Sequence, residues 1–162
     1  MSDILCIYYT RTGKTRYAMQ DIATALDAEL VEIDDGQDRF GWRGYLRAGM
    51  EAMRKGTRPL QPYKCEKNLE DYKLVILGTP VWAGRCSSVI RALLKRRGLE
   101  MRRVGYILTR GSANRYEEIY DQMDKYTAKP HLMAESLRVG DVGYEFWRDK
   151  FIQEVRRYMD GQ

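Results

Sequence analysis

The hydrophobic positions of this chain follow two spacings, one typical of buried strands and one typical of amphipathic helices. Short apolar runs predict strands at residues 4–9, 29–34, 73–79, 104–109 and 130–139. Between these runs, apolar residues recur three and four positions apart, as they do on the buried face of a helix. This spacing predicts helices at about residues 14–27, 40–54, 88–97, 116–129 and 147–159.

The alternation of strand and helix predicts an α/β fold built on a parallel sheet. Residues 73–79, KLVILGT, carry apolar side chains side by side, as expected when helices cover both faces of a strand. The expected architecture therefore has three layers, with a doubly wound sheet between two layers of helices. A length of 162 residues fits one domain, residues 1–162, and no linker or repeat divides it.

The first predicted strand runs directly into a turn of hydroxyl groups and one glycine. This turn comprises Thr10, Arg11, Thr12, Gly13, Lys14 and Thr15, and it opens into the first predicted helix. A helix start leaves about four backbone N–H groups without partners and carries a partial positive charge. Threonine hydroxyls add hydrogen bonds, and the glycine lets an anion approach the backbone. The pattern predicts a phosphate-binding turn, and a capped turn without a ligand is the alternative.

Three familiar loops that bind phosphate or nucleotides do not match this turn. A Walker loop requires glycine five residues before Gly13, where this chain has Tyr8. A cysteine phosphatase loop requires arginine six residues after Cys6, where this chain has Thr12. A dinucleotide fingerprint requires three spaced glycines, of which only Gly13 is present. The turn therefore predicts none of these three classes of enzyme.

Two further strand ends carry residues that suit a flat ligand. The strand at 73–79 is followed by Pro80, Val81, Trp82, Ala83 and Gly84, and the strand at 104–109 runs into Thr109, Arg110, Gly111, Ser112 and Ala113. The Trp82 indole offers a large π face in a loop just past a strand end, which favours stacking on an aromatic ligand or contact with its rim. A buried core tryptophan is the alternative for this residue.

The T-x-T-G-x-T turn and the G-T-P-x-W segment at residues 78–82 together resemble the loops of the flavodoxin family. The resemblance spans nearly the whole chain and implies a five-stranded sheet with the strand order 2-1-3-4-5. It also implies FMN as the cofactor, with its 5′-phosphate held by residues 10–15 and partly neutralised by Arg11, Lys14 and Arg16. The flavin ring would lie between residues 80–84 and residues 109–113. The implied function is electron transfer through the flavin, and no acid, base or nucleophile stands out at these loops.

The composition adds limits on location and on metal chemistry. Hydrophobic residues make up 44% of the chain and charged residues 31%, which is typical of a soluble protein. No apolar run approaches the roughly 20 residues of a membrane span, so a cytoplasmic location is expected. The three cysteines and the single histidine, His131, lack metal-ligand spacing, so no metal site is expected. We expect Cys6 and Cys86 to be packing residues.

The formal charge of +5 departs from the acidic character that is usual in flavodoxins. Because opposite charges favour association, the expected partners are redox proteins with acidic docking surfaces, or NAD(P)H. Nucleic acid is not expected, because no DNA-binding motif accompanies the charge. The densest positive cluster, expected on the surface, comprises Arg91, Lys95, Arg96, Arg97, Arg102 and Arg103.

Residues 36–72 leave the most alternatives open. The helix at 40–54 either covers the sheet, or its Trp42 and Tyr45 border the cofactor, a partner protein or a second copy in a homodimer. Two other functions remain beside electron transfer. One is a small NAD(P)H-dependent FMN quinone or flavin reductase, and the other is a flavodoxin-like binding module that has lost its flavin.

Overall fold

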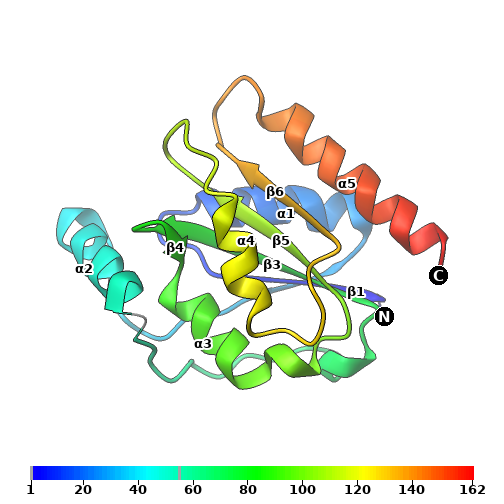
Figure 1. The fold of residues 1–162 in the computed structure, drawn as a ribbon, viewed down its shortest axis with the longest axis horizontal. Helices are drawn as coiled ribbons and strands as arrows, with labels where there is room; N and C mark the ends of the chain where they lie inside the picture. The colour runs from blue at the N-terminus through cyan, green and yellow to red at the C-terminus, as the bar shows by residue number, and fades with distance from the viewer. Residues whose placement is uncertain (1, 55) are drawn as a thin grey trace.

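The structure is a computed structural model that describes residues 2–54 and 56–162. Strands and helices alternate through most of the chain, as the periodicity predicts (Figure 1). In chain order they are β1 (Ile4–Tyr8), α1 (Lys14–Leu26), β2 (Glu29–Glu32), α2 (Gly41–Arg54), β3 (Leu74–Trp82), β4 (Arg85–Cys86), α3 (Ser88–Arg97), β5 (Val104–Thr109), α4 (Glu118–Asp124), β6 (Met133–Leu137) and α5 (Tyr144–Asp160). In the described part of the chain, no helix is long and apolar enough to cross a bilayer.

Five parallel strands form the main sheet, in the order β2-β1-β3-β5-β6. The short strand β4 pairs antiparallel with the end of β3 and lies off this path. With β4 set aside, the observed order is the predicted order 2-1-3-4-5. The strand order reverses between β1 and β3, and in such sheets ligands bind outside the carboxyl ends of the strands at that point.

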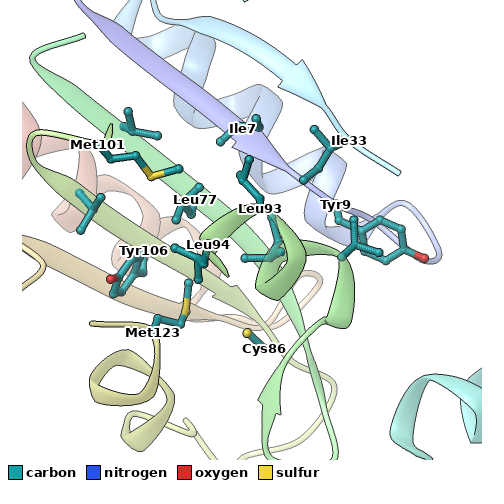
Figure 2. Packing of buried hydrophobic residues seen from close by; sticks show 14 of the residues in the cluster. Ile7, Tyr9, Ile33, Leu77, Cys86, Leu93, Leu94, Met101, Tyr106 and Met123 are labelled. Carbon is teal, nitrogen blue, oxygen red and sulfur yellow. The ribbon is translucent and has the colours of Figure 1, made fainter. Parts of the chain in front are cut away.

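Helices cover both faces of the sheet, which confirms the three-layer prediction. Helices α1 and α5 lie against one face, and α3 and α4 lie against the other (Figure 1). Figure 2 shows the core on the α3 and α4 side, where Ile7 and Leu77 of the sheet face Leu93 and Leu94 of α3. Cys6 is buried in the opposite core, and this burial raises the pKa of its thiol to about 12.

Helix α2 does not cover the sheet as one alternative predicted. Its buried residues are Gly44, Ala48 and Ala52, which pack near the β3–β4 hairpin and α3. A Cβ at Gly44 would lie 1.9 Å from backbone atoms of Arg39, so only glycine allows this close approach. The large apolar side chains on the other side of the helix stay exposed, and they are Trp42, Tyr45, Leu46, Met50 and Met53.

Arg91 was expected on the surface and is instead buried between three elements. Its guanidinium donates hydrogen bonds to the carbonyl oxygens of Ala52 and Cys86, at 3.4 and 3.2 Å. These bonds tie α3 to the end of α2 and to β4. The surface prediction for Arg91 was wrong because helical spacing alone does not show which other segments place carbonyl oxygens beside the helix.

The predicted helix at 116–129 is much shorter in the structure, where α4 ends at Asp124. At this point the Asp124 carboxylate has one partner on β5 and one in the irregular segment before β6. It accepts a hydrogen bond from the Tyr106 hydroxyl at 2.7 Å and contacts the His131 ring at 2.8 Å. Trp147 is half-buried and packs against the core on the α1 and α5 side, with the Arg115 and Lys150 cations over its ring.

Candidate functional site

The carboxyl ends of β1, β3 and β5 meet around a cavity of about 170 Å³ at the switch point of the sheet. The cavity is lined by Thr10, Arg11, Thr12, Lys14, Thr15, Tyr45, Pro80, Val81, Trp82, Thr109, Arg110 and Gly111. Eleven of these twelve residues belong to the three segments that the sequence singles out, and Tyr45 is the addition. The structure thus brings together three segments that lie far apart in the chain.

The first loop leaves the start of α1 open toward the cavity. Gly13 adopts a left-handed conformation with φ of 100°, and its amide donates a hydrogen bond to the Thr10 hydroxyl at 2.9 Å. In the described structure no side chain caps α1, and no atom lies within 4 Å of a Cβ built on Gly13. The amides of the first turn are therefore available to an anion, which a helix N-terminus attracts.

The first and third loops are joined by a direct contact between hydroxyl groups. The Oγ1 atoms of Thr15 and Thr109 lie 2.6 Å apart, and both side chains are buried. Thr15 belongs to the first turn of α1, and Thr109 is the last residue of β5. This contact fixes the distance between the anion-binding turn and the third loop.

Basic side chains surround the cavity, but not all of those expected. Arg11 donates a hydrogen bond to the Arg39 carbonyl oxygen at 3.1 Å, and Lys14 is exposed at the mouth. Arg16 was expected to help neutralise a phosphate, and this was wrong. It lies outside the cavity lining and pairs with Glu32 of β2 at 2.9 Å, because its helical position points it toward that strand.

Arg110 adds a cation on the far side of the cavity. Its Nε donates to the Ser136 hydroxyl at 2.9 Å, and its Nη1 donates to the Ser112 carbonyl oxygen at 2.6 Å. Burial, followed by the nearby charges of Arg115 and Arg138, lowers the pKa of this guanidinium. Arginine nonetheless stays protonated in proteins, so the third loop presents a positive charge.

The second segment is not the loop that the sequence predicts. β3 continues through Trp82, and Ala83 and Gly84 form a two-residue turn into β4 with φ values of 50° and 73°. Two positive φ values suit the right-handed twist of a hairpin. Thr79 secures the base of this hairpin, because its hydroxyl accepts a hydrogen bond from the Ser87 amide at 2.9 Å.

The Trp82 side chain lines the cavity but is buried, with 5% of its surface exposed, so it fits the predicted rim contact and not the predicted stacking face. The Tyr9 ring lies edge-on to it at 5.4 Å, and the Arg39 guanidinium lies 5.1 Å from the ring centre. The face that a ligand would need is therefore covered by the protein. Only a margin of the Trp82 side chain reaches the cavity.

Tyr45 supplies the exposed aromatic ring that Trp82 does not. It lies on α2 with 65% of its surface exposed, and the Arg11 guanidinium lies 5.5 Å from its ring centre. The sequence signal for it was the aromatic residue on the apolar face of the helix at 40–54.

Of the sixteen residues that the sequence predicts to bind the cofactor, five do not line the cavity: Gly13, Ala83, Gly84, Ser112 and Ala113.

Arg39 holds α2 beside the cavity and was not singled out from the sequence. It is buried and donates two hydrogen bonds of 2.7 Å to Asp35 and a further one of 2.7 Å to Glu51 of α2. Burial acts to raise the pKa of Asp35, but the Arg39 hydrogen bonds outweigh it and lower that pKa. A lone arginine in an irregular segment carries no sequence signal for burial.

The donor set around the cavity matches the chemistry of FMN. The uncapped helix start, the threonine hydroxyls and Lys14 suit a phosphate, and no acidic residue lies in the first turn of α1 among the described residues. Pro80, Val81 and Gly111 offer backbone and apolar surface at the other end of the cavity. The residues present therefore fit this cofactor.

The fold and the site define a doubly wound α/β protein with an uncapped helix start and a cavity at the switch point of its sheet. A family model described as flavodoxin matches residues 3–138, and the chain belongs to the flavodoxin family. No curated protein matches this sequence.

Solved structures share the fold at low sequence identity. A flavoprotein in complex with FMN from Lactobacillus acidophilus NCFM is 19% identical, with a TM-score of 0.68, over 91% of this chain and 99% of that one. The NAD(P)H:quinone oxidoreductase from Methanothermobacter marburgensis is 14% identical, with a TM-score of 0.53, over 97% and 95% of the chains. Two-electron reduced Megasphaera elsdenii flavodoxin is 12% identical, with a TM-score of 0.56, over 95% and 98%.

Proposed function

We propose that this protein binds FMN in the cavity at the ends of β1, β3 and β5 and transfers electrons through it. The observation that carries the proposal is the uncapped start of α1, which opens with a left-handed glycine into a cavity lined by the other two loops. Family membership and a similar flavoprotein solved with FMN support it. When bound, FMN supplies one-electron or two-electron chemistry, and the protein positions and tunes it.

In this arrangement the phosphate lies at the first turn of α1, beside Thr12 and Lys14. The flavin ring lies between the end of β3 and the third loop, where Arg110 offsets the negative charge of the reduced ring. Tyr45 replaces Trp82 as the aromatic side chain available to contact the ring, because its ring is exposed and Trp82 is covered.

An absorption spectrum before and after addition of FMN tests this proposal directly. A yellow protein that quenches FMN fluorescence supports it, and a colourless protein that leaves the fluorescence unchanged contradicts it. The variant Thr12→Glu places a carboxylate beside the phosphate and should weaken FMN binding by at least about tenfold, or 1.4 kcal/mol. Thr24→Glu, near the other end of α1, is the matched control and should bind FMN normally.

A small-molecule reductase is the second candidate, and one observation favours it over a pure carrier. An apolar pocket adjoins the FMN cavity on the α2 side, and a carrier that serves only protein partners does not require one. Steady oxidation of NAD(P)H by the FMN-loaded protein would support the reductase. Reduction by a partner protein without NAD(P)H turnover would support the carrier.

A further inference from the structure

A second pocket opens beside the FMN cavity, between α2 and the tip of the β3–β4 hairpin. Its volume is about 230 Å³, and it is lined by Tyr45, Leu46, Gly49, Met50, Met53, Trp82 and Ala83. Tyr45 and Trp82 also line the FMN cavity, so these two side chains separate the two spaces. A ligand in the second pocket would therefore lie next to one in the first.

We propose that this pocket binds a small, apolar, planar molecule that accepts electrons from the flavin. The inference rests on the proposed function for its redox role, while the binding itself depends only on the pocket. For a quinone, the flavin reduced by two electrons, which carries one negative charge, would transfer a hydride to the ligand, and the second proton would come from solvent. The flavin is reoxidised and the ligand leaves as a hydroquinone, and NAD(P)H or dithionite serves as the reductant.

The chemistry of the walls selects an apolar ligand. Among the described residues that line the pocket, none carries an ionisable acid or base other than the tyrosine phenol. A charged ligand would lose hydration here without a compensating partner. Aromatic and thioether side chains also suit a ring, because methionine sulfur packs favourably against aromatic groups. Met50, Met53 and Tyr45 provide these contacts.

Gly49 keeps the pocket open on the helix side. A Cβ at this position would lie 3.9 Å from the Ala83 Cβ, which is an ordinary contact, so a larger side chain would extend into the pocket space. Ala83 forms the opposite wall in a left-handed conformation that L-residues rarely adopt.

The pocket walls have apolar surface that a ligand would cover. Tyr45 and Met53 have 65% and 67% of their surfaces exposed, although both border a hollow rather than a flat face. A second copy of the chain is a poorer occupant, because Arg43, Arg47 and Arg54 lie on the same helix and the chain carries a charge of +5. Like charges would meet if two copies paired through α2.

The pair Gly49→Leu and Arg47→Leu tests the proposal, with 2-methyl-1,4-naphthoquinone as the probe. Gly49→Leu fills the pocket, while Arg47→Leu adds the same side chain on the solvent-facing side of α2. We expect Gly49→Leu to weaken probe binding by at least about tenfold and Arg47→Leu to leave it unchanged. Binding of the probe is measured by quenching of the protein's own fluorescence, first without FMN and then with FMN bound.

Leu46→Arg is a second variant, since it places a charge in the pocket wall at an exposed position. It should weaken probe binding while FMN binding stays normal. Equal probe affinity in the native protein and all variants would overturn the proposal. The proposal would also be overturned if analytical ultracentrifugation showed a dimer of the native protein that Gly49→Leu dissociates. Because the probe is titrated without FMN, a protein that binds the probe but not FMN would contradict the proposed function alone.

Discussion

The hydroxyl oxygens of Thr15 and Thr109 lie 2.6 Å apart, although the two residues are 94 positions apart in the chain. The contact is buried and joins the start of α1 to the end of β5 across the candidate FMN cavity. It shows how the fold holds the first and third predicted loops, residues 10–15 and 109–113, in one site.

Removal of one hydroxyl should leave the other without its partner in a buried place. We expect Thr15→Val or Thr109→Val to lower the free energy of unfolding by about 1–2 kcal/mol. The double variant should cost less than the sum of the two, because it leaves neither hydroxyl unpaired. Urea unfolding of the three variants measures this, and strictly additive losses would count against the contact.

Gly13 adopts a conformation that only glycine holds without strain. Because a Cβ would meet no described atom within 4 Å, Gly13→Ala should act through backbone strain alone and cost about 1–2 kcal/mol. Gly111→Ala is the matched control, since Gly111 has equal space and no positive φ. Urea unfolding should show a clear loss for the first variant and a change within about 0.5 kcal/mol for the second.

Ala83 carries strain that a different residue would relieve. With φ of 50°, this position suits asparagine, which tolerates the left-handed region better than alanine. We expect Ala83→Asn to raise the free energy of unfolding by about 0.5–1 kcal/mol. Ala113→Asn, in an exposed loop without positive φ, should leave it unchanged in the same thermal or urea unfolding measurement.

Among the charged residues near the site, Arg39 should cause the largest loss of stability when it is replaced. Arg39→Leu leaves the buried Asp35 carboxylate and Glu51 without their shared partner, at a cost of about 3–5 kcal/mol. Lysine should not restore stability, because it cannot replace the two-pronged hydrogen bonds to Asp35. Arg43→Leu replaces an exposed arginine of α2 and is the control. An equal loss of stability in that variant would contradict the proposed role of Arg39.

Glu135 should make stability fall as the pH rises. Burial raises its pKa above the ordinary value of 4.5, and the ion pair with Arg115 only partly opposes this. The folded state therefore holds this proton more tightly than the unfolded state, so stability decreases from about pH 4.5 up to the folded pKa.

The variant Glu135→Gln should lack this decrease, since glutamine does not titrate. Urea unfolding of both proteins across about pH 4 to 8 gives a difference curve in which other groups cancel. We expect the variant to gain stability relative to the native protein as the pH rises. Parallel curves would show that the Glu135 pKa is not raised.

The sequence predicted the elements well where the signal was local. The helix at 88–97 and the strand at 104–109, whose bounds match α3 and β5, both follow from neighbouring residues. The stacking prediction for Trp82 and the surface prediction for Arg91 were wrong for a shared reason. Each side chain is covered in part by a segment distant in the chain, with Tyr9 and Arg39 at Trp82 and Ala52 at Arg91. Local sequence patterns do not indicate such contacts.

The sequence by itself determined the alternation of strands and helices and the glycine turn at residues 10–15 that opens α1. Periodicity and a turn's need for glycine are properties of adjacent residues, so they can be seen without the fold. Only the tertiary structure decided that Tyr45 lines the cavity, that Arg39 holds α2 and that an apolar pocket adjoins the site. These features depend on packing between segments far apart in the chain, which local sequence patterns do not specify.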